Sequence, residues 1–463
     1  MPAYTPLTPE IISRIEQAVN PSRVMKDHDR RCEYGKDAGE VSALPELIVE
    51  AESAAQVEAL LALANEYRFP VTPRGLGTGV AGGAVPLFGG VVLSLARMNR
   101  ILSIERENLI AVVEPGVVNM DLREAVRREG LFYPPDPASL DTCSIGGNAA
   151  TNAGGPSCLK YGTTRDYILG VEAVLPTGEK INAGVQTRKG VVGYDLLRLL
   201  VGSEGTLGVI TKLILKLIPQ PQAVTTMVAV YDGLEDAMRA VTGVLTGGHI
   251  PCSMEFLDRR CLELSGDIMP FPEARDGGAF LIIECDGIQA HIEREIEEIG
   301  VICADFGALT VAMAPDSQRR TKMWDIRREV ALRIEEGAVV YIPADIVVPL
   351  GRIAEFVMFL PDLERRFGIR IFTFGHAGDG NIHVNVTASA PEMRMRAEEG
   401  VECIIDRVLS MGGTMSGEHG VGIAKKRFIH KELSPASIRL QRGIKRLFDP
   451  RLILNPGKIF DDE

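Results

Sequence analysis

Histidines are scarce in this chain, and three of the seven lie in two polar stretches near its C-terminal end. The first stretch, 375–385, holds His376 and His383 on either side of small and polar residues typical of a turn. A hairpin there would bring both imidazoles close together across neighbouring strands. The second stretch holds the adjacent pair Glu418 and His419 between glycines.

These residue types can hold a divalent metal. Two imidazoles and a carboxylate are a common ligand set for zinc, iron or manganese, and they leave coordination positions open for a substrate. The alternative for each histidine taken alone is a hydrogen-bonded structural residue. Polar, glycine-flanked surroundings inside otherwise apolar strands weaken that alternative, but the residues alone leave both interpretations open.

A further candidate lies on a predicted helix at 323–329, which carries the only tryptophan of the chain. An arginine that projects from this helix into a pocket would bind a substrate carboxylate through two parallel hydrogen bonds. Arg327 and Arg328 are both candidates. A solvated position on the helix surface is favoured for at least one of them.

The stretch 73–83 contains five glycines, one arginine and one threonine. Successive backbone N–H groups of such a loop form a concave site suited to phosphate. A flexible linker is the alternative, but linkers are usually polar, and this stretch lies between two apolar segments. Three of its glycines satisfy the dinucleotide pattern G-x-G-x-x-G, which requires a helix to follow. Pro86 and the pair Gly89 and Gly90 exclude one, so we expect phosphate on loop backbone between strands.

Two further glycine-rich blocks follow at 134–155 and 202–210, separated by predicted strands. Their small, amide and hydroxyl side chains suit a backbone that lies against a flat ring or a phosphate. Unrelated turns are the alternative. Three such tracts in one region predict a single extended ligand that lies across them.

The predicted elements place these motifs in an α+β chain. Asn119 is expected to cap a helix that ends near residue 129. Beyond residue 220, strands and helices follow in the order β-α-β-β-α-β, the ferredoxin-like arrangement, with the last strand at 303–311. A weaker copy of this order comes next, and the two copies could share one continuous sheet.

Composition bounds the class of protein. A chain of 463 residues with 46% hydrophobic residues should form two or more domains, and its net charge of −12 argues against nucleic acid or an anionic membrane as the main partner. The eight cysteines include no C-x-x-C pair, so neither a zinc ribbon nor an iron–sulfur cluster is predicted. Without an apolar leader or a run of membrane-spanning length, we expect a cytoplasmic protein.

Taken together, these motifs resemble a known family over roughly residues 40–460. The glycine-rich tracts look like the FAD-binding domain of vanillyl-alcohol oxidase-type flavoproteins, and the C-terminal motifs look like the glycolate oxidase and D-lactate dehydrogenase branch of that group. The resemblance implies an α+β fold with a two-part FAD-binding domain and a ferredoxin-like substrate, or cap, domain. The motifs that carry it are 73–79, 145–155, 193–196, 202–208, 375–383, 418–420 and 455–457.

The resemblance implies a bound FAD whose pyrophosphate lies on residues 74–78. The FAD should be bound non-covalently, because the glycine loop contains no histidine or cysteine to which the flavin could be attached. The residues that the resemblance assigns to the cofactor are Pro73, Arg74, Gly75, Leu76, Gly77, Thr78, Gly82, Pro135, Asp136, Ser139, Cys143, Gly146, Gly147, Asn152, Gly155, Glu204, Ile210 and Asn455.

The resemblance also implies the oxidation of a D-2-hydroxy acid, with the hydride passing to flavin N5. Arg327 would hold the substrate carboxylate, and His419 would be the general base. Members that use dicarboxylates carry a lysine shortly after this helix, whereas residues 339–345 contain none, which favours a small monocarboxylate such as D-lactate or glycolate. The implied metal ligands are His376, His383 and Glu418, and the implied substrate contacts are Arg327, Asn385 and His419.

These expectations divide the chain into an FAD-binding domain at 1–220, a substrate domain with the metal site at 221–424, and a C-terminal segment at 425–463 that returns to the first domain. Reduced flavin must be reoxidised, so we expect an electron-transfer flavoprotein, an iron–sulfur subunit or a diffusible acceptor as partner. The alternative function is a non-catalytic flavin-binding subunit that relays electrons. Such a subunit would have no use for a metal set and a base.

Overall fold

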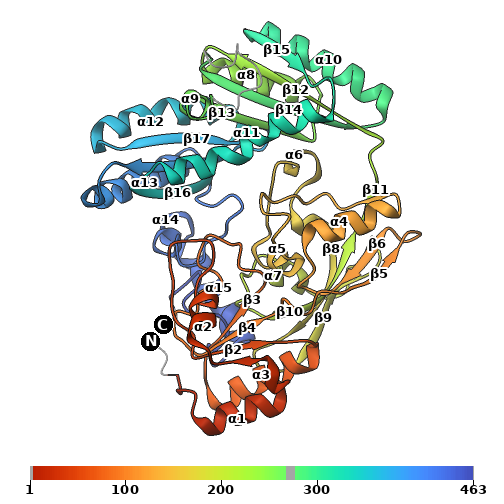
Figure 1. Ribbon diagram of the computed structural model, residues 1–463, viewed down its shortest axis with the longest axis vertical. Coiled ribbons are helices and arrows are strands. Elements are labelled where there is room, and N and C mark those ends of the chain that lie inside the picture. The colour runs from red at the N-terminus through yellow and green to blue at the C-terminus, as the bar shows by residue number, and fades with distance from the viewer. Residues whose placement is uncertain (1–3, 267–276, 462–463) are drawn as a thin grey trace. The chain divides into compact units, whose positions relative to one another are not determined.

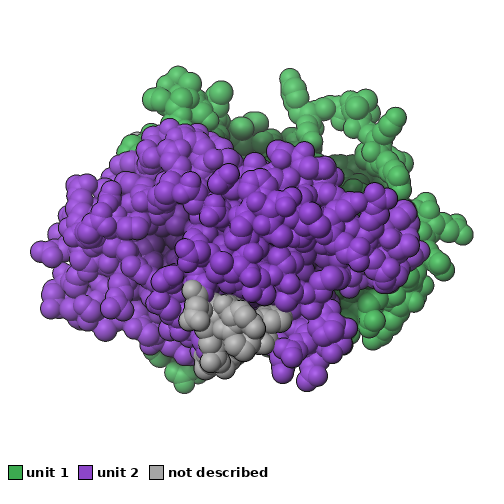
Figure 2. All heavy atoms as spheres, turned by 90° about the horizontal axis from the view of Figure 1, so that it is seen from above, with its two compact units in different colours: residues 1–154, 163–220, 418–463 green, residues 155–162, 221–417 purple. Residues whose placement is uncertain are grey.

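The computed structural model describes residues 4–266 and 277–461. Residues 1–3, which belong to the N-terminal stretch considered above for a leader, therefore lie outside the described residues. The chain forms two compact units, drawn in different colours in Figure 2. Unit 1 comprises residues 1–154, 163–220 and 418–463, and unit 2 comprises residues 155–162 and 221–417. Residues 418–424, assigned from the sequence to the substrate domain, belong to unit 1 in this division.

The first sheet of unit 1 has four strands in the order β1-β2-β4-β3, of which Figure 1 labels β2, β3 and β4. Its last three strands run parallel, and α3 connects β2 to β3, as a parallel pair requires. Ser53 begins this helix because its hydroxyl accepts a hydrogen bond from the N–H of Gln56. The elements are β1 (Val24–Met25), β2 (Leu47–Glu50), α3 (Ala54–Tyr67), β3 (Val71–Arg74) and β4 (Val91–Ser94).

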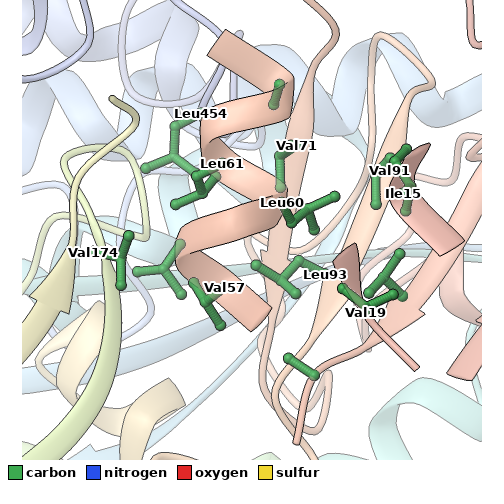
Figure 3. Packing of buried hydrophobic residues seen from close by; sticks show 14 of the residues in the cluster. Ile15, Val19, Val57, Leu60, Leu61, Val71, Val91, Leu93, Val174 and Leu454 are labelled. Atoms are coloured by element: carbon green, nitrogen blue, oxygen red, sulfur yellow. The ribbon is translucent and has the colours of Figure 1, made fainter. Parts of the chain in front are cut away.

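The core of this part of unit 1 lies between α3 and the sheet (Figure 3). Leu60 and Leu61 on the helix belong to the same buried cluster as Leu93 on β4. Leu454, from the C-terminal segment, is fully buried in this cluster as well. The backbone N–H of Val71 also donates to the carbonyl of Ile453, at 2.8 Å. The C-terminal segment is therefore an integral part of unit 1.

The second sheet of unit 1 is antiparallel, with five strands in the order β5-β6-β10-β8-β9. Helix α4 follows β6, but Asn119 is its first residue rather than its cap. The cap position belongs to Val118, and the buried Asn119 lies in the first turn, where its amide nitrogen donates to the carbonyl of Pro135 at 3.2 Å. The elements are β5 (Ile101–Glu105), β6 (Ile110–Val113), α4 (Asn119–Arg128), β8 (Ile168–Val174), β9 (Lys180–Gly184) and β10 (Val209–Lys216).

Further helices and a two-stranded sheet also belong to unit 1. Strands β7 and β11 form a two-stranded sheet, and α15 begins where the Ser434 hydroxyl accepts from the N–H of Ser437. The elements are α1 (Pro9–Ala18), α2 (His28–Tyr34), β7 (Leu131–Phe132), α5 (Ile145–Thr151), α7 (Leu196–Leu200), β11 (Ile218–Pro219), α14 (Ile429–Glu432) and α15 (Pro435–Phe448).

Unit 2 is built on one seven-stranded sheet in the order β15-β12-β14-β13-β17-β18-β16. The first four strands have the ferredoxin-like order, and β13 pairs with β17 to join them to the second copy. The prediction that both copies share one sheet is therefore confirmed. The strands are β12 (Ala223–Tyr231), β13 (Ser253–Asp258), β14 (Ala279–Gly287), β15 (Thr310–Met313), β16 (Val340–Val347), β17 (Arg370–His376) and β18 (Asn381–Ala388).

Helices cover both faces of this sheet. Helix α11 packs Met323 and Ile326 against the face that carries Leu257. On the opposite face the Tyr231 hydroxyl donates to the carbonyl of Cys303 in α10, at 3.3 Å. Burial on both faces explains why the central strands read as continuous apolar runs. The helices are α6 (Cys158–Tyr161), α8 (Leu234–Thr246), α9 (Arg259–Leu264), α10 (Gln289–Asp305), α11 (Ser317–Glu336), α12 (Ile353–Phe367) and α13 (Arg394–Ser410).

One expectation for unit 2 needs correction. The strand predicted at 303–311 begins only at Thr310, because α10 extends to Asp305 and Cys303 continues its buried face. After α13, in the second ferredoxin-like copy, Thr414 forms a single bridge to Val347 of β16.

Candidate functional site

The glycine loop of unit 1 runs from β3 to β4 without an intervening helix, as predicted. Gly77 has a φ of +77°, a conformation that side-chain-bearing residues rarely adopt, and a Cβ there would overlap the guanidinium of Arg74. Gly79 and Gly83 face open space, with no atom within 4 Å of a Cβ built on either. The loop therefore presents bare backbone, which an added methyl group would obstruct at Gly77.

The other glycine-rich tracts lie against this loop. A Cβ on Gly75 would overlap the hydroxyl of Ser144, which caps α5 by accepting from the N–H of Gly147 at 3.2 Å. A Cβ on Gly205 would come within 2.7 Å of Pro73. The structure thus brings all three tracts together in unit 1.

Asn455 ties two of these tracts to the C-terminal segment. Its amide nitrogen donates to the carbonyl of Gly83 at 2.9 Å and to that of Glu204 at 2.8 Å. Its position in the left-handed region, with a φ of +45°, aims the buried amide between the two loops. A loop of bare N–H groups beside the start of α5 fits a diphosphate, so the residues present suit FAD.

Several residues assigned to the cofactor use their side chains within the protein. The Asn152 amide oxygen accepts from the Thr163 hydroxyl at 3.0 Å and from the N–H of Arg165 at 2.9 Å. A Cβ on Gly146 would overlap Pro115, so this glycine is required by packing. Cys143 and Ile210 are buried, and Gly155 belongs to unit 2.

Arg74 is held beside the glycine loop. Its guanidinium donates to the carbonyl of Lys36 at 2.5 Å and lies over the ring of Tyr34, 5.3 Å from the centroid. Burial lowers the pKa of Arg74 from its ordinary value, with the charge of Asp37 opposing the shift. The remaining donors of a guanidinium in this position can serve an anion on the loop.

Glu204 fastens the segment that follows His419. Its carboxylate accepts from the N–H of Val421 at 2.8 Å and from that of Gly422 at 2.7 Å. Burial raises the pKa of Glu204 despite these hydrogen bonds. Glu418 and His419 lie just before this anchored turn, with His419 Nε2 3.8 Å from Glu418 Oε1.

In unit 2, the predicted hairpin brings two histidines together. His376 ends β17 and His383 lies on β18, the neighbouring antiparallel strand. Their rings meet edge to face with centroids 5.3 Å apart. The Phe374 ring lies 5.3 Å from that of His383. Two imidazoles at this separation can face one ligand.

A buried carboxylate that the sequence did not single out lies beside them. Glu255 on β13 is fully buried, and its Oε1 lies 2.6 Å from His376 Nδ1. Its Oε2 accepts from Arg327 Nε at 2.7 Å. Burial opposes the ionisation of Glu255, but its interactions with His376 and Arg327 outweigh burial and lower the pKa of Glu255. We call these three residues, with Phe374 and His383, the Glu255 cluster.

The two candidate arginines of α11 have different surroundings. Arg327 lies in the Glu255 cluster, with its guanidinium carbon 4.5 Å from the Phe374 ring centroid and its side chain 12% exposed. The Arg328 side chain is 65% exposed and paired with Asp325. The expectation that at least one of the two lies on the solvated surface therefore applies to Arg328. Because Glu255 takes the Nε edge of Arg327, the two Nη groups form the edge on which a carboxylate could bind.

Asp345 and Tyr341 on β16 were also missed. Buried Asp345 accepts from the Asn381 amide at 2.7 Å and from the N–H of Gly417 at 2.9 Å. The Tyr341 hydroxyl donates to the amide oxygen of Asn385 at 2.9 Å, and burial raises the pKa of Tyr341 to about 12. Asn385 is thus oriented by a neighbour within unit 2.

A usable signal for the missed carboxylates was present. Glu255 and Asp345 each interrupt an apolar strand, and buried charges of this kind are almost always paired. Nothing in the sequence identified their partners, because those partners come from other strands and from α11.

The eight cysteines, all within the described residues, remain thiols.

Comparison with known proteins places these observations in context. Residues 45–184 match the family described as FAD binding domain, and residues 220–459 match the family described as FAD linked oxidases, C-terminal domain. The chain is 38% identical to the glycolate oxidase subunit GlcD of Bacillus subtilis (strain 168), covering 98% of this chain and 97% of that protein. It is also 38% identical to a D-lactate dehydrogenase of Anaerostipes hadrus, covering 98% of each.

Solved structures agree on the fold. The chain resembles a p-cresol methylhydroxylase crystallised with substrate, with a TM-score of 0.81 and 17% identity over 98% of this chain and 96% of that one. The predicted fold class, an α+β chain with a vanillyl-alcohol oxidase-type FAD-binding part, is confirmed. Among the helices of the described residues, none is both long and apolar enough to span a membrane.

Proposed function

Because the chain belongs to the FAD-linked oxidase family, we propose that it oxidises a small D-2-hydroxy acid, such as D-lactate or glycolate, to the 2-oxo acid. The names of the two relatives support this substrate class. The observation that carries the proposal is Arg327, a largely buried cation whose Nη edge is presented by Glu255 beside two histidines. A hydroxy acid offers both a carboxylate for the arginine and an adjacent hydroxyl.

The substrate would be fixed first by its carboxylate. Arg327 would bind both carboxylate oxygens through its two Nη groups, because its Nε already donates to Glu255. A second carboxylate would need another cation, and residues 339–345 supply no lysine. These features favour a monocarboxylate over a substrate such as 2-hydroxyglutarate.

We assign a divalent metal, with ligand types suited to zinc, iron or manganese, to His376, His383 and Glu418. The edge-to-face histidine pair of unit 2 fits such an ion. Bound there, a metal would supply Lewis-acid chemistry at the substrate hydroxyl. Chain connectivity supports Glu418 as the third ligand, because Gly417, its neighbour, is held by Asp345 on the strand paired with His383. Because adjacent Cα atoms are only about 3.8 Å apart, the backbone of Glu418 lies close to the position at which Gly417 is held.

His419 is assigned as the general base that takes the hydroxyl proton. The turn after it is held by the Glu204 carboxylate, which limits the movement of this segment. FAD on the glycine loop would supply the redox chemistry as hydride acceptor at N5. Asn385, oriented by Tyr341, would contribute a further polar contact to the substrate.

The electron acceptor is assigned to a separate partner, such as an electron-transfer flavoprotein, an iron–sulfur subunit or a diffusible acceptor. The chain has no C-x-x-C pair for a cluster of its own. Oxygen consumption by the isolated protein should therefore be slow in the presence of substrate. Rapid oxygen consumption, measured with an oxygen electrode, would show that no partner is needed.

The decisive experiment is anaerobic. D-lactate, L-lactate, glycolate and D-2-hydroxyglutarate are added separately to the purified yellow protein, and the flavin absorbance is recorded. We expect rapid bleaching by D-lactate or glycolate, and loss of bleaching after chelation with restoration by Zn²⁺ or Mn²⁺. A protein that none of the four acids bleaches would contradict the proposed function and favour an electron-relay subunit.

A further inference from the structure

Two buried glutamates connect helix α11 to the sheet of unit 2, and only one of them reaches the candidate site. Glu284 accepts from Arg320 through both of its oxygens, at 2.7 and 2.8 Å, and from Trp324 Nε1 at 2.9 Å. Arg327, one helical turn after Trp324, reaches Glu255 instead. Only Glu255 also contacts a histidine of the candidate site, His376.

We propose that Glu255 is a positioning residue that fixes, through one carboxylate, both the tautomer of His376 and the orientation of Arg327. This inference rests on the proposed function, in which His376 binds the metal and Arg327 the substrate. Each oxygen of Glu255 serves one partner, so neither contact can be replaced by the other. The carboxylate is completely buried, and water cannot substitute for it.

The contact with His376 determines which ring nitrogen can bind a metal. An ionised carboxylate only accepts hydrogen bonds, so His376 Nδ1 must carry the proton in the 2.6 Å contact. The lone pair of a neutral ring then lies on Nε2, which is the ligand atom of such a tautomer. Carboxylates that orient histidine ligands in this way typically change metal affinity by about 10- to 100-fold when they are removed.

The contact with Arg327 determines which edge of the guanidinium faces a substrate. Glu255 Oε2 takes the Nε–H, and the Phe374 ring lies under the guanidinium plane. Rotation of the guanidinium would break the hydrogen bond to a buried charge, which is costly. The Nη pair is therefore held as a fixed fork, and binding a carboxylate requires little loss of side-chain freedom.

Substitution by glutamine tests this arrangement sharply. Glutamine offers one accepting oxygen and one donating amide group, whereas both partners of Glu255 are donors. Glu255→Gln can therefore satisfy His376 or Arg327, but not both. Either the lone pair of His376 moves from Nε2 to Nδ1, or Arg327 loses its Nε contact. Glu255→Asp retains two accepting oxygens and the charge but shortens the reach.

The measurement uses the full FAD-loaded protein, stripped of metal and titrated with Zn²⁺ against a chromophoric chelator. Steady-state kinetics with D-lactate and glycolate accompany the titration. We expect Glu255→Gln to weaken Zn²⁺ binding by about 10- to 100-fold, or to raise KM to a similar extent through Arg327. Glu255→Asp should retain more Zn²⁺ affinity than Glu255→Gln, because it preserves the tautomer of His376.

Glu284→Gln is the matched control, since it disturbs a buried glutamate with partners on the same helix but no contact to His376. It should lower the thermal stability while leaving the Zn²⁺ affinity at the wild-type value. Wild-type Zn²⁺ affinity and KM in Glu255→Gln would overturn the inference and leave the proposed function intact. A wild-type protein that bound neither Zn²⁺ nor Mn²⁺ would instead overturn the proposed metal site and the role of Glu255 at His376.

Discussion

The candidate sites of the two units are built from different chemical groups. Unit 1 offers backbone, with Gly75, Gly77 and Gly205 pressed so closely against neighbours that a Cβ has no room. Unit 2 offers charged side chains, with Glu255, His376 and Arg327 hydrogen-bonded inside a sheet. Added volume should therefore damage unit 1, and altered charge should damage unit 2. The comparison also explains why glycines dominate the motifs of unit 1.

His419 is an exception to this contrast, because it belongs to unit 1 and yet we assign a chemical role to its side chain. His419→Ala should slow flavin reduction by about 10²- to 10⁴-fold, the usual contribution of a general base, while FAD stays bound. Stopped-flow bleaching under nitrogen measures the rate. The exposed His430 provides a control, and His430→Ala should behave like wild type. Wild-type reduction in His419→Ala would remove this residue from the proposed mechanism.

Arg327→Lys tests whether unit 2 depends on geometry as well as charge. Lysine keeps the positive charge but loses the planar fork, so the KM for the hydroxy acid should rise by about 10- to 100-fold, as expected for a charged hydrogen-bonded contact. Arg328→Lys, one residue along the same helix but largely exposed, should change KM little. Equal KM values in both variants would contradict the assignment of Arg327 to the carboxylate.

Gly77→Ala tests the requirement for bare backbone in unit 1. The left-handed φ of +77° costs a residue with a Cβ about 1–2 kcal/mol, and the added methyl would overlap Arg74. We expect the variant to be purified with several-fold less FAD, measured as the ratio of flavin to protein absorbance. Gly79→Ala, in the same loop but with open space around the added Cβ, should retain more FAD than Gly77→Ala. Full FAD content in Gly77→Ala would show that the loop tolerates a side chain.

The smallest effect concerns Glu204, a charged side chain used structurally in unit 1. Its pKa is raised by burial, so the folded state holds a proton that the unfolded state releases. The free energy of unfolding should therefore fall as pH rises from the ordinary glutamate value towards the raised one, by at most about 1.4 kcal/mol per pH unit. Denaturant titrations of wild type and Glu204→Gln across this range measure the difference. A wild-type slope retained in Glu204→Gln would assign the effect to other groups.

The sequence predicted the parts of the site that are continuous along the chain. Composition and spacing predicted the glycine tracts and the His376–His383 hairpin. The periodicity of unit 2 predicted two copies on one sheet. Glu255 escaped prediction because its partners lie 72 and 121 positions away in the chain. The role of Asn119 was missed for a similar reason, since the carbonyl that its amide nitrogen contacts, that of Pro135, lies 16 positions further along the chain.

The chain passes between the two units four times, at 154–155, 162–163, 220–221 and 417–418. The short excursion at 155–162 is fastened in unit 2, where Lys160 and Tyr161 both bond to Asp286. A single backbone nick at any one of these passages therefore leaves the units covalently linked. Expressing either unit alone would therefore require joining segments that are far apart in the sequence.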